Sequence, residues 1–112
     1  HHSNYYVWFE RGRSDYCRNR GFSYLEMEEK DNLMMVVAES QCRYKSPAFY
    51  EDVLTIRTRA ETIRSRSLTF VYEVLRGSDS KLLATGMTKH VMTDSAKNIK
   101  TLPEKYKQQL NG

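Results

Sequence analysis

Cysteine and proline are scarce in this sequence, and the scarcity of cysteine excludes several kinds of site. Two cysteines and two prolines occur among 112 residues. Cys17 and Cys42 are too few for a disulfide framework, and no CxxC or clustered His/Cys spacing indicates a metal site. Neither cysteine has a neighbouring base in the sequence, so we do not expect either thiol to be a catalytic nucleophile.

Long apolar runs and the short motifs of several enzyme classes are also missing. No segment approaches the roughly 20 apolar residues of a membrane-spanning helix, and none has the apolar centre of a signal peptide. Together with the sparse cysteines, this predicts a cytoplasmic protein. The sequence contains no GxSxG nucleophile motif and no phosphate-binding glycine loop.

Positive charge is in excess, but it is not concentrated. Eighteen Lys and Arg residues against fourteen Asp and Glu residues give a net charge of +4. These bases are spread along the chain, whereas nucleic-acid-binding proteins usually gather them in one patch or tract. We therefore expect a solvated basic surface and no nucleic-acid partner, with an RNA- or DNA-associated domain as the least favoured alternative.

Aromatic residues are abundant for so small a chain. Eight Tyr, four Phe and one Trp offset an apolar fraction of 39%, because each ring buries a large area. A length of 112 residues allows one domain with a single core. A small aromatic-rich chain often completes its core against a partner subunit, so the composition favours an oligomer.

The beginning of the chain has the apolar spacing of a helix. Over residues 4–20 these positions recur every three or four residues: Tyr5, Trp8 or Phe9, Gly12 and Tyr16. Glycine in a helix interior costs about 1 kcal/mol relative to Ala, so we expect another element to approach the backbone closely at Gly12. Gly21 suits the left-handed position that follows a helix.

From residue 33 onward the apolar pattern alternates, as is typical of strands. We predict strands over residues 34–45, 53–64, 67–76 and 81–93, and short helices over residues 24–28 and 103–110. Alternate residues of the second and third strands should face inward: Leu54, Ile56, Thr58, Ala60 and Thr62, then Leu68, Phe70, Tyr72 and Val74. Gly86 interrupts the fourth strand, where we expect a bulge or the close approach of a ligand. Because no helix separates the strands, the sheet should be antiparallel.

Several segments together resemble one known family. The segment His2–Arg13 reads HSNYYVWFERGR and is followed by Gly21, and further matches lie at Tyr44–Ala48, Tyr50–Leu54, Arg66–Phe70, Leu83–Gly86 and Pro103. In this order and spacing, nearly the whole chain resembles the 4-hydroxybenzoyl-CoA thioesterase-like family, which includes the Tol-Pal-associated acyl-CoA thioesterases. The resemblance implies an α+β hot-dog fold, in which a curved antiparallel sheet wraps around one long central helix.

The resemblance also implies an activity and an assembly. It implies hydrolysis of an acyl-CoA thioester to free acid and CoA, by a homodimer that joins two sheets edge to edge, with a tetramer of two dimers as the alternative assembly. It implies no cofactor, neither a metal nor a prosthetic group, since CoA is part of the substrate. A hot-dog protein that binds acyl-CoA or acyl-carrier protein without cleaving it is the alternative function.

The catalytic residues follow from the same resemblance. In this family the Asp that acts as nucleophile or general base lies seven residues before the position that His2 matches. We therefore interpret residues 1–112 as a single domain without the N-terminal strand and the catalytic-Asp turn, and its leading histidines as native. The backbone N–H of His2 would face the thioester carbonyl, with acid/base assistance by its side chain as a further hypothesis. Glu10 is a candidate base by analogy with a related branch, and an ion pair with Arg11 or Arg13 is its alternative.

The substrate-binding residues complete the set. CoA carries phosphates, so its site needs basic groups, and the turn between the second and third strands supplies Arg64, Arg66 and Ser67. The family places CoA contacts there and on the neighbouring strand, which adds Lys89. A solvated basic turn is an equally weighted alternative. Tyr5 and Tyr6 are candidates for the acyl pocket, although helical spacing requires most of the aromatic residues nearby for the core.

Overall fold

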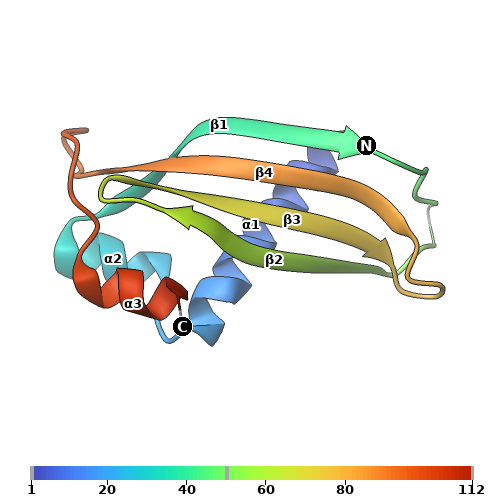
Figure 1. Cartoon of the computed structure of the whole chain (residues 1–112), viewed down its shortest axis with the longest axis horizontal. Coiled ribbons are helices and arrows are strands. Elements are labelled where there is room, and N and C mark those ends of the chain that lie inside the picture. The colour runs from blue at the N-terminus through green and yellow to red at the C-terminus, as the bar shows by residue number, and fades with distance from the viewer. Residues whose placement is uncertain (1, 50, 112) are drawn as a thin grey trace.

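The computed structural model describes the backbone of residues 2–49 and 51–111, and the side chains of those residues from Tyr5 onward. Its elements follow one another as α1 (His2–Asn19), α2 (Tyr24–Asp31), β1 (Met34–Tyr44), β2 (Leu54–Ile63), β3 (Ser67–Arg76), β4 (Leu82–Thr93) and α3 (Glu104–Asn111) (Figure 1). The predicted strands agree with these bounds to within about a residue at each end. The predicted helix at 24–28 was too short, because α2 continues to Asp31.

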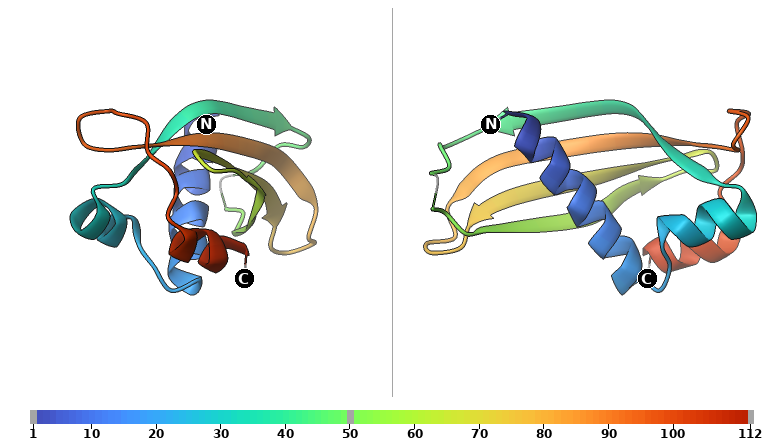
Figure 2. Two further views of the ribbon diagram at one scale, coloured as in Figure 1. Left: turned by 60° about the vertical axis from the view of Figure 1, so that its left-hand side comes forward. Right: turned by 180° about the vertical axis from the view of Figure 1, so that it is seen from behind.

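The four strands form one antiparallel sheet in the order β1-β4-β3-β2. The sheet curves, and α1 crosses its concave face, while α2 and α3 gather at one end of the molecule (Figure 2). A curved antiparallel sheet around one long helix is the predicted α+β hot-dog architecture. Strands β1 and β2 are the two edges of this sheet.

Two glycines allow α1 and the sheet to approach closely. A Cβ atom at Gly12 would lie 2.5 Å from Thr58 Oγ1, so the close backbone approach predicted there is confirmed. A Cβ atom at Gly86 would collide with the ring of Phe9. The predicted bulge at Gly86 was therefore wrong, because the strand pairs regularly at this residue. The close approach at Gly86 is made by the Phe9 ring of α1, and the approach of a ligand stays a prediction.

The core lies between α1 and the concave face. The Phe9 ring stacks on the Tyr72 ring with centroids 4.4 Å apart and an angle of 13° between the planes. The residues of β3 predicted to face inward are all buried, and they are Leu68, Phe70, Tyr72 and Val74. Burying these side chains stabilises the fold by roughly 1.5–3 kcal/mol for each large apolar residue.

The inward face of β2 departs from simple alternation near its end. The register with β3 shifts between Ala60 and Thr62, so one extra residue is accommodated there. As a result Thr62 is exposed and Ile63 turns toward the core, which makes the prediction of an inward Thr62 wrong. A bulge reverses the faces of the residues that follow it.

The end of α1 is set by local backbone chemistry. Gly21 has φ of +94°, as expected for the left-handed residue that terminates a helix. The amides of Gly21 and Phe22 donate to the carbonyls of Arg18 and Cys17, at 3.0 and 3.1 Å. The chain then turns into α2, whose first amides are capped by Ser23, which accepts a hydrogen bond from the Glu26 amide at 3.2 Å.

Candidate active site

The N-terminus of α1 lies beside the end of β1 (Figure 1). The helix begins at His2, so the amides of its first turn have no carbonyl partners within the helix and carry the positive end of its dipole. The Tyr5 ring meets the Tyr44 ring of β1 edge-on, with centroids 5.0 Å apart. This contact fixes the first turns of α1 against the sheet.

The side chain of His2 lies outside the described residues, so its acid/base role stays a prediction. Its backbone lies in the first turn of α1, and the contact of its N–H with a thioester carbonyl also stays a prediction. Unpaired amides at a helix N-terminus can stabilise the negative charge of a tetrahedral intermediate.

The two tyrosines predicted for the acyl pocket occupy different environments. Tyr5 is buried in the core, with Trp8 and Tyr44 against its ring. Tyr6 is 41% exposed and contacts Phe9 edge-on at 5.8 Å. The Tyr6 side chain is therefore accessible to a ligand and that of Tyr5 is not, and the role of both in an acyl pocket stays a prediction.

Glu10 lies on the exposed side of α1. Among the described residues it forms no ion pair, so the alternative prediction of a pair with Arg11 or Arg13 was wrong. The reason is that Arg13 points into the core, where its guanidinium donates to the Tyr72 hydroxyl at 3.2 Å. Glu10 instead lies at the rim of a small pocket beside α2.

A chain of buried polar groups continues from Arg13 across the sheet. The Tyr72 and Thr88 hydroxyl oxygens are 2.6 Å apart, and Nε2 of His90 is 2.8 Å from the same Thr88 oxygen. Burial, and to a lesser degree the charge of Arg13, lowers the pKa of His90 to about 4, so the ring is neutral near pH 7. Sequence reasoning missed this chain. The one feature of the sequence that indicated a buried polar group here is the position of Arg13, which lies four residues after Phe9 on the apolar side of the helix.

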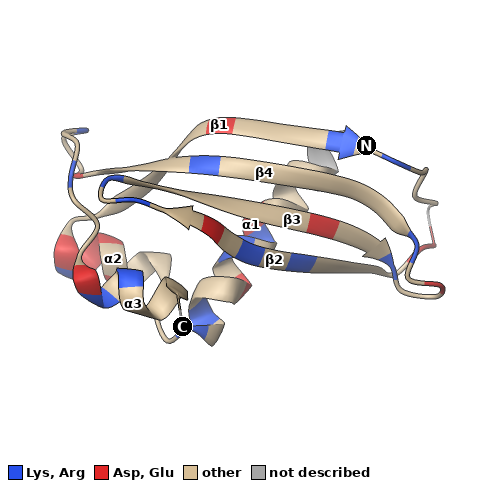
Figure 3. Cartoon of the chain, in the orientation of Figure 1, with Lys and Arg blue, Asp and Glu red and all other residues tan. Residues whose placement is uncertain are grey.

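The predicted CoA-binding residues lie at the other end of the sheet. Arg64 and Arg66 are exposed in the β2–β3 turn, beside Ser67, and the Arg64 amide donates to the Ser67 carbonyl at 2.8 Å. Lys89 alternates with the inward-facing Thr88 and therefore lies on the outer face of β4. Figure 3 shows the β2–β3 turn at the opposite end of the sheet from the beginning of α1. One chain thus brings the turn residues together but does not bring them to Tyr5, Tyr6 or His2.

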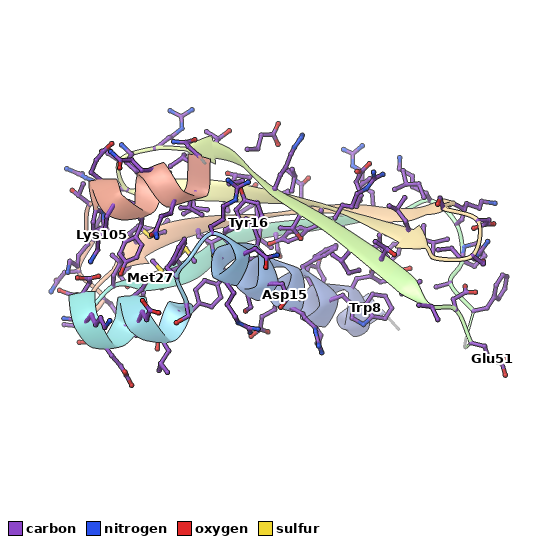
Figure 4. The ribbon with its side chains drawn as sticks, turned by 90° about the horizontal axis from the view of Figure 1, so that it is seen from below. Trp8, Asp15, Tyr16, Met27, Glu51 and Lys105 are labelled. Atoms are coloured by element: carbon purple, nitrogen blue, oxygen red, sulfur yellow. The ribbon has the colours of Figure 1, made fainter. Side chains whose placement is uncertain are left out.

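A groove that sequence reasoning missed runs between α1 and the edge strand β2. It has a volume of about 600 Å³, with aromatic residues of α1 on one wall and alternate residues of β2 on the other. Figure 4 shows Trp8, Asp15 and Tyr16 on the helix wall. The side-chain oxygen of Thr58 is buried beside this groove without a hydrogen-bond partner. Within the described part of the chain no strand pairs with the outer side of β2, and the backbone groups of such an edge suit a further strand.

The described part of the chain offers neither a metal-binding cluster nor a membrane-spanning helix. Among the side chains that the structure describes, from Tyr5 to Phe49 and from residue 51 to residue 111, no group of three or more His, Cys, Asp or Glu could hold a metal ion. No helix in those same ranges is long and apolar enough to cross a membrane.

The fold defines the class: this is an α+β hot-dog domain, in which one long helix lies against a curved antiparallel sheet. The chain belongs to the Thioesterase-like superfamily, whose family model matches residues 1–110. The family resemblance predicted from the sequence is thereby confirmed. A crystal structure of a hypothetical protein from Aquifex aeolicus superposes with a TM-score of 0.89 and 33% identity, covering 98% of this chain and 84% of that one.

Three similar proteins carry names that describe an esterase or thioesterase activity. A putative esterase of Aquifex aeolicus is 34% identical over 99 residues, which cover 88% of this chain and 75% of that protein. The putative acyl-CoA thioesterase YneP of Bacillus subtilis is 29% identical, covering 84% of this chain and 67% of the relative. The acyl-CoA thioester hydrolase YbgC of Escherichia coli is 27% identical, covering 73% and 60%. This chain thus spans about 60 to 75% of the length of these relatives.

Proposed function

We propose that this chain hydrolyses an acyl-CoA thioester to a free acid and CoA at the N-terminus of α1. The observation that carries the proposal is the helix end itself, presented by a domain of the Thioesterase-like superfamily. The names of YneP and YbgC support acyl-CoA as the substrate class. We also propose a cytoplasmic location and no metal or prosthetic group, with CoA entering as part of the substrate.

The geometry suggests how the reaction proceeds. A nucleophile attacks the thioester carbonyl, its carbon becomes tetrahedral, and the oxygen takes the negative charge. The amides in the first turn of α1 stabilise that oxygen, which lowers the barrier because the charge is greater in the transition state than in the substrate. The carbon–sulfur bond then breaks and CoA leaves as a thiolate that is protonated. The resemblance places an Asp seven residues before the position of His2, in one of two roles. As a general base it takes a proton from the attacking water, so the acid forms directly and that proton can pass to the CoA thiolate. As the nucleophile it forms an acyl–Asp anhydride, and a water molecule then hydrolyses this anhydride to release the acid and restore the Asp.

A homodimer would bring the N-terminus of α1 of one chain and the basic β2–β3 turn of the other to the same end of the sheet. If two β1 strands pair antiparallel, the two chains run in opposite directions along the shared edge. The β2–β3 turn of the partner chain then lies at the end of the sheet where the N-terminus of α1 of this chain lies. The exposed apolar side chains of β1 support this edge as the contact, since Val36 and Val37 are 46% and 47% exposed. We propose this dimer, with a tetramer of two dimers as the larger alternative.

The test is a turnover assay on the product of the complete gene. Release of the CoA thiol from short aliphatic, long aliphatic and aromatic acyl-CoA substrates is followed with a thiol-reactive dye, and at least one substrate is expected to turn over. Replacing the upstream Asp by Asn should reduce kcat by orders of magnitude while the circular-dichroism spectrum stays unchanged. Tight binding of acyl-CoA or acyl-carrier protein without turnover would favour the non-catalytic alternative.

A further inference from the structure

Arg13 is a buried cation without a carboxylate partner in the described part of the chain. The residue is 8% exposed, and no ion pair connects it to any residue that the structure describes. Its guanidinium donates to the neutral hydroxyl of Tyr72. A charge removed from water is costly unless an opposite charge or several acceptors compensate it. The surroundings of Arg13 therefore need an anion or further acceptors.

The titratable groups beside Arg13 do not supply that anion. Burial raises the pKa of the Cys17 thiol to about 12 and also raises the pKa values of Tyr24 and Tyr72. The pKa of His90 is lowered to about 4. At neutral pH all four groups are uncharged. The two carboxylates that line the same pocket, Glu10 and Glu28, form no ion pair with Arg13.

Unused donors of this cluster face a pocket between α1, α2 and β1. The Nε atom of Arg13 and the hydroxyl of Tyr24 are buried and make no hydrogen bond of good geometry among the described residues. Arg13, Tyr24 and Cys17 nevertheless lie close enough to shift one another's pKa values. Both residues line a pocket of about 160 Å³. A water molecule occupies about 30 Å³, so several groups of that size fit. Because guanidinium N–H groups only donate, the missing partner must be an acceptor.

The walls and rim of the pocket restrict the anion that fits. The lining combines the apolar side chains of Met27, Leu33 and Met35 with the polar groups of Glu10, Arg13, Tyr24 and Glu28. Glu10 and Glu28 lie at the rim with exposed side chains, so a multiply charged anion would be repelled. We propose that this pocket binds a small monovalent anion of the chloride class, held by the Arg13 Nε–H and the Tyr24 hydroxyl. The site is independent of the proposed hydrolysis.

Bromide can locate such an ion in the unmodified protein. Crystals grown in sodium bromide should show an anomalous difference peak within hydrogen-bond distance of Arg13 Nε and Tyr24 Oη. In solution, replacing sodium gluconate by sodium chloride at equal ionic strength should raise the Tm by several degrees, because a ligand that binds only the folded chain stabilises it. No peak together with no chloride dependence would show that water satisfies these donors, and the proposal would be wrong.

Variants distinguish a bound anion from a carboxylate partner of Arg13. Tyr24→Phe removes one donor and should reduce the chloride-dependent rise in Tm, and Arg13→Met should abolish it. Arg11→Met is the matched control, since Arg11 is exposed on the same helix and should leave the rise unchanged. Glu10→Gln and Glu28→Gln should enlarge the response to chloride by removing repulsion. If either Gln variant instead destabilises the protein as much as Arg13→Met in gluconate, that carboxylate is the partner of Arg13 and the proposal is overturned.

Discussion

Gly86 determines how deeply the Phe9 ring can enter the sheet. Gly86→Ala would place a methyl group inside that ring, so we expect the free energy of unfolding to fall by about 1–3 kcal/mol. Urea denaturation measures the loss. The double variant Gly86→Ala with Phe9→Leu should lose less than the sum of the two single variants, because the smaller side chain at residue 9 leaves room for the added methyl group. Strictly additive losses would contradict this account of the contact.

His90 makes stability depend on pH below neutrality. Its pKa is about 4 in the folded chain, against about 6.5 in the unfolded chain. The unfolded chain therefore binds the proton more tightly, so this contribution to stability is complete above about pH 6.5 and is lost as the pH falls toward 4. The difference of the two pKa values corresponds to about 3 kcal/mol.

The variant His90→Gln isolates that contribution, because Gln keeps a polar partner near Thr88 but does not titrate. Between pH 6.5 and 4.5 its free energy of unfolding should change less than that of the unmodified chain. Denaturation curves at several pH values provide the comparison, in which the carboxylates contribute equally to both proteins. If the free energies of unfolding of the two proteins fall in parallel as the pH is lowered, His90 is not the source of the pH dependence.

Single buried polar residues were the hardest features to predict from the sequence. Arginine is usually exposed, so nothing in its residue type indicated that Arg13 is buried. Its hydrogen bond to Tyr72 joins residues 59 positions apart and depends on how α1 lies across the sheet. Such contacts arise from tertiary packing, which local spacing does not contain.

Elements were predicted more completely than residues, because their periods are local. The alternation in residues 67–76 predicted both the bounds of β3 and its buried face. In β2 the same reasoning failed after Ala60, because the bulge is visible only from the pairing with β3. The groove between α1 and β2 was missed for a similar reason: its two walls come from separate segments.

The β2–β3 turn offers a test at the scale of an element. Arg64→Ala combined with Arg66→Ala should raise KM for acyl-CoA by about tenfold or more, because each guanidinium would lose a charged hydrogen bond to a phosphate. The value of kcat should change little. Steady-state kinetics with acyl-CoA and with the matching acyl-pantetheine, which lacks the nucleotide, measure the effect.

Two controls accompany that double variant. Acyl-pantetheine should show no rise in KM, since it has no nucleotide phosphates to lose. Arg57→Ala removes another exposed arginine, which pairs with Glu73 at 3.4 Å on the outer face of the sheet, and should leave KM unchanged. An equal rise in KM for Arg57→Ala would indicate a general effect of charge rather than a site at the turn.

For the whole molecule, the β1 edge is the feature that predicts assembly. Val36→Lys places a charge on this edge and should shift a dimer to monomers, because charged side chains on an edge strand oppose pairing with another strand. Light scattering coupled to size exclusion gives the mass in solution. Val53→Lys is the control, since Val53 is 76% exposed and lies outside β1. A monomeric unmodified chain would contradict the proposed dimer.

The two close approaches at Gly12 and Gly86 have a consequence for how this scaffold can vary. They prevent α1 from sliding or rotating on the sheet, because either movement would drive a side chain into Thr58 or the Phe9 ring into a strand. The contacts at Gly12 and Phe9, in the middle of α1, thus fix the direction in which the amides at its N-terminus point. Residues around the substrate can therefore change the acyl group that fits without altering where those amides point.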